Sequence, residues 1–249
     1  MTADEAQLTI LAALAAGFTE IKLTGELSKT GIGGNWGTFI NNKKITKCDL
    51  TGVTDWGRTP TLPDVAFANC TALQEVTLPG DMKVIGGSAF SGCAALTKVN
   101  LSQVTWINLS AFWGCTSLET LALDNVTAIG QEAFYGCTGL ETLKIPKCTE
   151  FGTYIVSGCR SLTRIEATAA GNFVDISDGR SSIERTAVFH NRDSHYGDSA
   201  FNPAKCDLVL NADKKQDGNA TPKVFSDNEW LVMPNGQLMR WNSITFAQQ

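Results

Sequence analysis

The sequence has little histidine and no excess of positive charge. Only two of its 249 residues are histidines, His190 and His195, and its 20 Lys and Arg residues are outnumbered by 25 Asp and Glu residues. The formal net charge is -5 and the isoelectric point is near 5.1. Nucleic-acid binding needs a basic surface that contacts phosphates, so this charge balance argues against a nucleic-acid partner.

Long apolar segments are also missing. The one apolar run near the start, Leu8 to Ala16, is too short to span a bilayer. Asp4 and Glu5 precede it where a signal peptide has basic residues. The sequence therefore predicts no transmembrane segment and no targeting signal in this chain. We expect either a cytoplasmic protein or a mature or trimmed form.

What the sequence does contain is a repeat. An Ala-Phe-x-x-Cys motif ends at Cys70, Cys93, Cys115 and Cys137, and a degenerate copy, Ile-Val-x-x-Cys, ends at Cys159. The steps between these five cysteines are 23, 22, 22 and 22 residues. A nearly constant period of this length is typical of a solenoid, in which each coil completes the core of its neighbours.

Each copy also carries an L-x-x-L-x-L block. Its second half alternates between apolar and polar residues, which predicts one short strand per coil, stacked in parallel. The strands contribute the inward columns Val76, Val99, Leu121, Leu143, Ile165 and Leu78, Leu101, Leu123, Ile145, Ala167. Two further inward columns follow, Met82, Val104, Val126, Cys148 and Ile85, Ile107, Ile129, Phe151. These columns predict a continuous apolar core.

The combined pattern, L-x-x-V-x-L followed by V-x-x-I-G-x-x-A-F-x-G-C, resembles the BspA-like leucine-rich repeats of many bacterial surface proteins. The resemblance covers roughly Leu62 to Ala167. It implies a curved solenoid at the cell surface or outside the cell, with a role in adhesion or protein binding.

The fold class expected is an α+β leucine-rich-repeat solenoid with a parallel β-sheet and about eight coils of 22–23 residues. We expect one domain, with a helical cap at 1–17, repeats at 18–168, an irregular coil at 169–205, and a final coil with a strand-containing cap at 206–249. Ile21 and Cys48 take the first strand column, and Phe39 takes the phenylalanine column. Asn42 replaces the cysteine, and its amide is expected to satisfy backbone carbonyls.

The two ends are less regular. Thr2 to Ala16 is predicted to be a helix, because Thr2 and Glu5 form a capping box and Gly17 provides a stop. Leu8, Leu11, Ala12 and Ala15 share the face expected to cover the first coil. At the other end, Ile165 and Leu208 are 43 residues apart, close to two repeat lengths, which predicts one divergent coil between them. The alternation from Gln237 to Phe246 predicts a final strand.

The five periodic cysteines allow two interpretations. The favoured one is a ladder of buried thiols, since cysteine and asparagine can both bond to backbone carbonyls. The alternative is disulfides between neighbouring coils, because strands about 4.8 Å apart allow them. Cys48, Cys148 and Cys206 occupy apolar strand positions and are expected to be core residues. No pair has C-x-x-C spacing, which argues against a zinc site.

Two surfaces are candidates for ligand binding. The first is the outward face of the parallel strands, here called the sheet face, which is either an interaction surface or merely a soluble one. Its candidate residues are Lys98, Asn100, Thr120, Thr142, Lys144, Arg164 and Glu166. The second is the aromatic strip of Trp106, Trp113 and Tyr135, which can stack on a sugar or receive a protein side chain if exposed. Its alternative is packing against the turns.

No catalytic motif emerges from the sequence. His190 and His195 lie near Asp193 and Asp198, a grouping that is either a metal or acid-base site or a solvated loop. The solvated loop is favoured, so we expect no catalytic residues, metal or cofactor. The sequence thus predicts a non-enzymatic surface or secreted binding protein with a protein partner. The alternative is a glycan-binding or cell-envelope scaffold protein.

Overall fold

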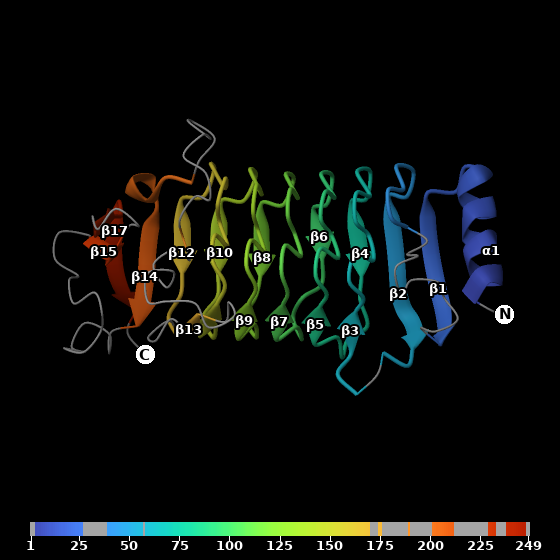
Figure 1. Ribbon diagram of the computed structural model, residues 1–249, viewed down its shortest axis with the longest axis horizontal. Coiled ribbons are helices and arrows are strands. Elements are labelled where there is room, and N and C mark those ends of the chain that lie inside the picture. Colours follow the sequence, from blue (N-terminus) through green and yellow to red (C-terminus); the bar gives the residue numbers. More distant parts are fainter. Residues whose placement is uncertain are drawn as a thin grey trace.

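The computed structural model describes residues 3–26, 39–56, 58–169, 174–175, 189, 201–211, 229–232 and 238–247. These residues form an elongated solenoid whose strands lie side by side along its length, with the helix at one end (Figure 1). The elements are α1 (Ala3–Ala15), β1 (Glu20–Glu26), β2 (Lys47–Thr54), β3 (Thr61–Leu62), β4 (Glu75–Thr77), β5 (Val84–Ile85), β6 (Lys98–Val99), β7 (Trp106–Ile107), β8 (Thr120–Ala122), β9 (Ala128–Ile129), β10 (Thr142–Lys144), β11 (Glu150–Phe151), β12 (Arg164–Glu166), β13 (Val174–Asp175), η4 (Pro203–Lys205), β14 (Asp207–Asn211), β15 (Glu229–Val232), β16 (Leu238–Arg240) and β17 (Ser243–Ala247).

Each regular coil contributes one strand to each of two stacks. The strands that present the sheet face are β1-β2-β4-β6 and β8-β10-β12-β14-β17. A second sheet consists of β3-β5-β7-β9-β11-β13. All pairs in these sheets are parallel, in agreement with the repeat pattern. Among the described residues, five coils of regular length carry both strands, from β3 with β4 to β11 with β12. The expected number of about eight regular coils is therefore not confirmed.

Two interior ladders hold the coils at a constant spacing. Phe39, Phe67, Phe90, Phe112 and Phe134 stack with ring centroids 5.2–5.7 Å apart. Beside them, each periodic cysteine donates its thiol hydrogen to the carbonyl oxygen of the phenylalanine one coil earlier. The Cys115 Sγ, for example, lies 3.1 Å from the Phe90 oxygen. All eight cysteines are buried free thiols, which favours the thiol ladder over disulfides.

The turn around each phenylalanine requires left-handed backbone at two columns. Gly92, Gly114, Gly136 and Gly158 occupy one of them with φ of 69° to 76°, where glycine has no steric penalty. The other column is held by Val65, Ser88, Ser110, Glu132 and Tyr154, with φ of 52° to 60°. Val65 is unusual there, because β-branched residues strongly disfavour this conformation.

The helix α1 is present where the sequence predicts one, but the face assigned to the core is wrong. Ile10 and Leu14 join the hydrophobic core, whereas Leu8 and Leu11 are 67% and 44% exposed. Ala12 and Ala15 are exposed as well. Because residues 6–19 contain no charged side chain, the helix is apolar on several sides and its sequence does not single out one face.

Two expectations for irregular coils also need correction. Strand β12 pairs directly with β14, with Ile165 opposite Leu208, so no coil adds a strand between them to the sheet face. The 43-residue spacing instead belongs to one long coil, of which β13 pairs with β11 in the second sheet. The predicted final strand is two strands: β16 pairs antiparallel with β15, and β17 pairs parallel with β14.

Asn42 differs from the cysteines in the bond it makes. Its side-chain oxygen accepts hydrogen bonds from the backbone N–H groups of Lys44 and Ile45, at 2.8 and 3.0 Å. The expected bond to a backbone carbonyl is not among these contacts. Asn42 therefore closes its own turn, whereas each periodic cysteine links its coil to the preceding one.

Candidate binding surfaces

Several sheet-face candidates lie side by side because the coils have equal length. Thr120, Thr142 and Arg164 are aligned in one row across β8, β10 and β12. Lys144 and Glu166 are aligned in the next row. Lys98 belongs to the other half of the sheet face, because β6 and β8 are not paired in the ladder. The candidates therefore form one group on β8 to β12 and a separate pair, Lys98 on β6 and Asn100 just beyond it.

Charges on the sheet face are largely paired within the protein. The Arg164 Nε lies 2.7 Å from Glu166 Oε1, and the Lys98 Nζ lies 2.6 Å from Glu75 Oε1. The hydrogen bond from Lys98 lowers the pKa of the Glu75 carboxyl. Lys144 is exposed, and no ion pair involves it among the described residues. This lysine is thus the cation best placed to meet an acidic group of a partner.

Asn100 is exposed but has a structural role. Its side-chain oxygen accepts from the backbone N–H of Leu78 at 2.6 Å, and its amide nitrogen donates to the Leu78 oxygen at 2.9 Å. The side chain therefore replaces part of a strand ladder just beyond the end of β6. These two bonds limit the part that Asn100 can play in contacting a ligand.

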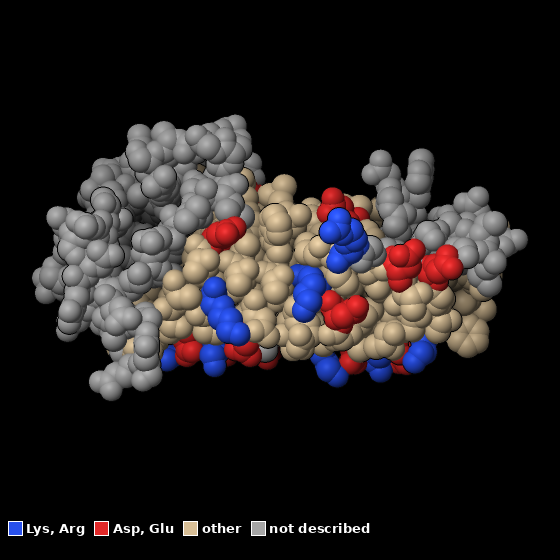
Figure 2. All heavy atoms as spheres, turned by 90° about the horizontal axis from the view of Figure 1, so that it is seen from below, with Lys and Arg blue, Asp and Glu red and all other residues tan. Residues whose placement is uncertain are grey.

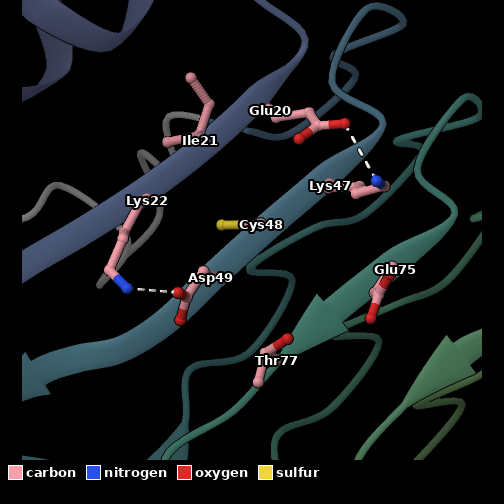
Figure 3. Close-up of a pocket in the computed structure, with 8 residues that line it drawn as sticks. All are labelled: Glu20, Ile21, Lys22, Lys47, Cys48, Asp49, Glu75 and Thr77. Atoms are coloured by element: carbon pink, nitrogen blue, oxygen red, sulfur yellow. Dashed lines mark ion pairs between the residues drawn. The ribbon is translucent and has the colours of Figure 1, made fainter.

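The sheet face is hollowed at its N-terminal end. A cavity of about 330 Å³ lies over β1, β2 and β4. Figure 3 shows the side chains that line it. Lys22 pairs with Asp49 at 2.8 Å, and Lys47 pairs with Glu20 at 3.0 Å. Hydrogen bonds from Lys22 and then Thr51 lower the pKa of Asp49 to about 2. Ion pairs thus line the rim of this cavity, and no feature of the sequence indicated a hollow here.

The aromatic strip is divided between the surface and the interior. The side chains of Trp106 and Trp113 are 45% and 42% exposed, whereas Tyr135 is 8% exposed. The rings of Trp113 and Tyr135 stack with centroids 5.7 Å apart and an angle of 10° between their planes. Tyr135 therefore packs against one face of the Trp113 indole. The third member of the strip, Trp106, lies on β7 of the second sheet. The second sheet runs along the lower side of Figure 1, and Figure 2 shows charged residues of both signs scattered among uncharged ones on that side.

Reactive groups are scarce among the described residues. Burial raises the pKa of the Cys115, Cys137 and Cys159 thiols, which keeps them protonated and poorly nucleophilic. Within the described ranges, no three His, Cys, Asp or Glu side chains come together as metal ligands would. His190 and His195 lie outside the described residues. In the described part of the chain, no helix has the length and hydropathy to cross a membrane.

One surface feature was missed by the sequence reasoning. Leu109 is 48% exposed and belongs to the same coil as Trp106 and Trp113. Among the residues whose side chains the structure describes, these three are the only exposed large apolar ones apart from Leu8, Leu11 and Phe18 near the N-terminus. The signal was present, because residues 99–118 contain no Asp, Glu, Lys or Arg. We call this stretch the uncharged coil.

The fold defines a leucine-rich-repeat solenoid, a class whose members are generally not enzymes. The BspA type leucine rich repeat region matches residues 38–170 in six copies. This match covers more than half of the chain, and the protein belongs to the BspA-type leucine-rich-repeat family.

Solved structures of bacterial proteins resemble the chain. A leucine rich cell surface protein from Faecalibacterium prausnitzii A2-165 is 25% identical with a TM-score of 0.51, and the match covers 63% of this chain and 44% of that one. A leucine-rich repeat protein from Bacteroides ovatus ATCC 8483 is 26% identical with a TM-score of 0.46, over 68% and 40% of the two chains. This chain thus spans less than half of either relative. A comparison with curated proteins gives no match.

Proposed function

We propose that this protein is a non-enzymatic binding protein of the bacterial cell surface that engages a protein partner through the sheet face. The observation that carries the proposal is the aligned group Thr120, Thr142, Lys144 and Arg164, which three strands present on one face. The Faecalibacterium relative, described as a cell surface protein, supports the location. Adhesion is the form of binding that we infer for such a location.

The chemistry of this group favours a particular kind of contact. Two threonine hydroxyls offer neutral hydrogen-bonding groups between the ion pairs at Lys98–Glu75 and Arg164–Glu166. Lys144 adds a positive charge that the protein itself does not neutralise through an ion pair among the described residues. We expect a polar protein surface with an acidic group opposite Lys144, and an on-rate that falls with added salt.

The experiment is a binding assay of the immobilised protein against a panel of extracellular-matrix proteins and polysaccharides. The test variant carries Lys98→Glu, Lys144→Glu and Arg164→Glu. The control carries Lys43→Glu, Lys44→Glu and Lys147→Glu, which changes the net charge equally in turns outside the strands. Loss of binding in the test variant alone supports the sheet face. Equal binding by wild type and test variant would contradict it.

A glycan is the second candidate partner, in a binding or cell-envelope scaffold role. Exposure of Trp106 and Trp113 favours it, because flat indole rings are suited to stacking on sugar rings. In the same assay, binding to a polysaccharide that survives the sheet-face variant would favour this candidate.

We also propose that α1 closes the N-terminal end of the solenoid within a single domain. Burial of Ile10 and Leu14 in the core cluster supports this role, because an uncovered end would expose apolar core and strand edge. Replacing Leu14 with Asp is expected to lower the unfolding free energy by about 3 kcal/mol. An unchanged urea midpoint would show that the helix contributes nothing to the fold.

A further inference from the structure

The uncharged coil, residues 99–118, differs chemically from every regular coil beside it. Lys98 and Glu119 bound it, and no charged residue lies between them. The preceding coil contains Asp81 and Lys83, and the following one contains Asp124 and Glu132. The uncharged coil also holds Trp106, Leu109 and Trp113, the exposed apolar side chains of the solenoid's middle. All of its polar side chains are neutral hydroxyls and amides, among them Asn108 and Ser110.

Trp113 and Tyr135 form a short stack outside the core, here called the outer ladder, and Trp113 is its last ring. Neighbouring coils are in step at this position, since the Gly92 N–H donates to the Trp113 oxygen and the Gly114 N–H donates to the Tyr135 oxygen, both at 2.7 Å. Ser91, Trp113 and Tyr135 therefore project from equivalent positions of successive coils. One face of the Trp113 indole stacks on Tyr135. The other face is directed toward the coil that has only Ser91 at this place.

The spacing of the interior phenylalanine rings shows how much room lies between equivalent side chains of neighbouring coils. Phe90 and Phe112 belong to the same two coils as Ser91 and Trp113, and their rings stack with centroids 5.2 Å apart. Because Ser91 has no ring, the position next to Trp113 in the outer ladder has no aromatic group, and we call this position the open step. A flat ring that enters from solvent can thus stack on Trp113 above Ser91, with the indole already held rigid by Tyr135.

We propose that this step is a binding site for one ring of a neutral sugar, within an uncharged oligosaccharide or polysaccharide. The absence of charge over a whole coil disfavours an anionic glycan and gives a charged peptide nothing to pair with. Neutral hydroxyl and amide side chains beside an exposed indole match a ligand that has hydroxyl groups around an apolar ring face. The inference rests on the second candidate function and is independent of the sheet-face proposal.

The experiment titrates the whole chain with maltohexaose, laminarihexaose and chitohexaose, measured by calorimetry and tryptophan fluorescence. Trp113→Ser removes the stacking surface. Ser91→Trp leaves that surface intact and fills the step with a ring of the protein, which the backbone accepts because the next coil has tryptophan at this position. Phe18→Ser is the control, since Phe18 is 64% exposed but lies near the N-terminus. Thermal melting checks that each variant is folded.

Binding of at least one hexasaccharide, weakened about tenfold or more in both Trp113→Ser and Ser91→Trp and unchanged in Phe18→Ser, is the expected result. Full affinity in folded Ser91→Trp would overturn the site. Failure of all three sugars at millimolar concentration would overturn the proposal. A tyrosine-rich peptide that binds where the sugars do not would assign the step to a protein side chain instead. None of these outcomes depends on Lys98, Lys144 or Arg164, so the sheet-face proposal stands or falls separately.

Discussion

The interior and the exterior of the same coils follow different rules. Inside, the phenylalanine column holds the same residue in five successive coils, and each ring stacks on the next. Outside, the residue that follows each of these phenylalanines changes from coil to coil: Ile40, Ala68, Ser91, Trp113 and Tyr135. The interior is repeated because every coil packs against a copy of itself. The exterior is free to vary, and we propose that binding specificity resides there.

The largest expected effect concerns the thiols. Burial raises the pKa of Cys137 to about 12, above the unfolded value of about 8.5. Below that unfolded value the thiol is protonated in both states, and as pH rises toward 12 only the unfolded chain releases the proton. The free energy of unfolding is therefore unaffected by ionisation of these thiols at neutral pH. It falls in the alkaline range, by about 1.5–2 kcal/mol per buried thiol at pH 10.

Urea unfolding at pH 7 and pH 10 in reducing buffer measures this loss. With several buried thiols the midpoint should fall steeply, and Cys137→Ser should reduce the fall by the share of one thiol. An identical midpoint at the two pH values would show that these thiols are not enclosed by the fold.

Removing one ring from the interior ladder has the next largest effect. Phe134→Ala should lower the unfolding free energy by about 3–5 kcal/mol, because a fully buried ring leaves a cavity between coils of fixed spacing. Chemical denaturation checks this value. A loss below about 1 kcal/mol would mean that neighbouring coils collapse to fill the space, and the ladder would then not set the spacing.

The thiol ladder is tested by a pair of substitutions at one position. Cys115→Ala removes the bond that Cys115 donates to the buried Phe90 carbonyl, which keeps its bond from the Cys93 N–H, and should cost about 1–2 kcal/mol. Cys115→Ser keeps a donor and should cost less. If denaturation ranks serine below alanine in stability, the thiol acts through its volume rather than through the hydrogen bond.

The smallest expected effect is a gain in stability. Val65 holds left-handed backbone with φ of 54° in a column where the next two coils have serine, a conformation that asparagine tolerates better than valine does. Val65→Asn should stabilise the protein by about 1 kcal/mol, whereas Ser88→Val should destabilise it by a similar amount. Melting temperatures that move together in the same direction would contradict this explanation.

The regular coils could be predicted from sequence because their period fixes register. Cys115 and Phe112 recur at nearly constant steps, so their columns, their burial and the parallel pairing all follow from counting residues. On the surface, counting identified Lys144 and Arg164 as outward residues. It did not reveal that Glu166 neutralises Arg164, or that Asn100 is bonded to the backbone of Leu78. Such contacts depend on side-chain rotamers, which a repeat period does not specify.

The ends could be predicted only in outline. In α1 the residues Leu8, Ile10, Leu11 and Leu14 offer more than one apolar face, so the orientation of the helix depends on the shape of the first coil rather than on its own pattern. Beyond Ile165, spacing suggested two coils where the pairing with Leu208 makes one. A spacing near two periods cannot distinguish two short coils from one long coil.

The most direct test of the division between interior and exterior compares two neighbours in the sequence. Phe112 is fully buried and Trp113 is 42% exposed. Urea denaturation of Phe112→Ala and Trp113→Ser should show a loss of about 3–5 kcal/mol for the first and below about 1 kcal/mol for the second. Comparable losses in the two variants would contradict the account, because Trp113 would then be part of the core and not a surface available to a ligand.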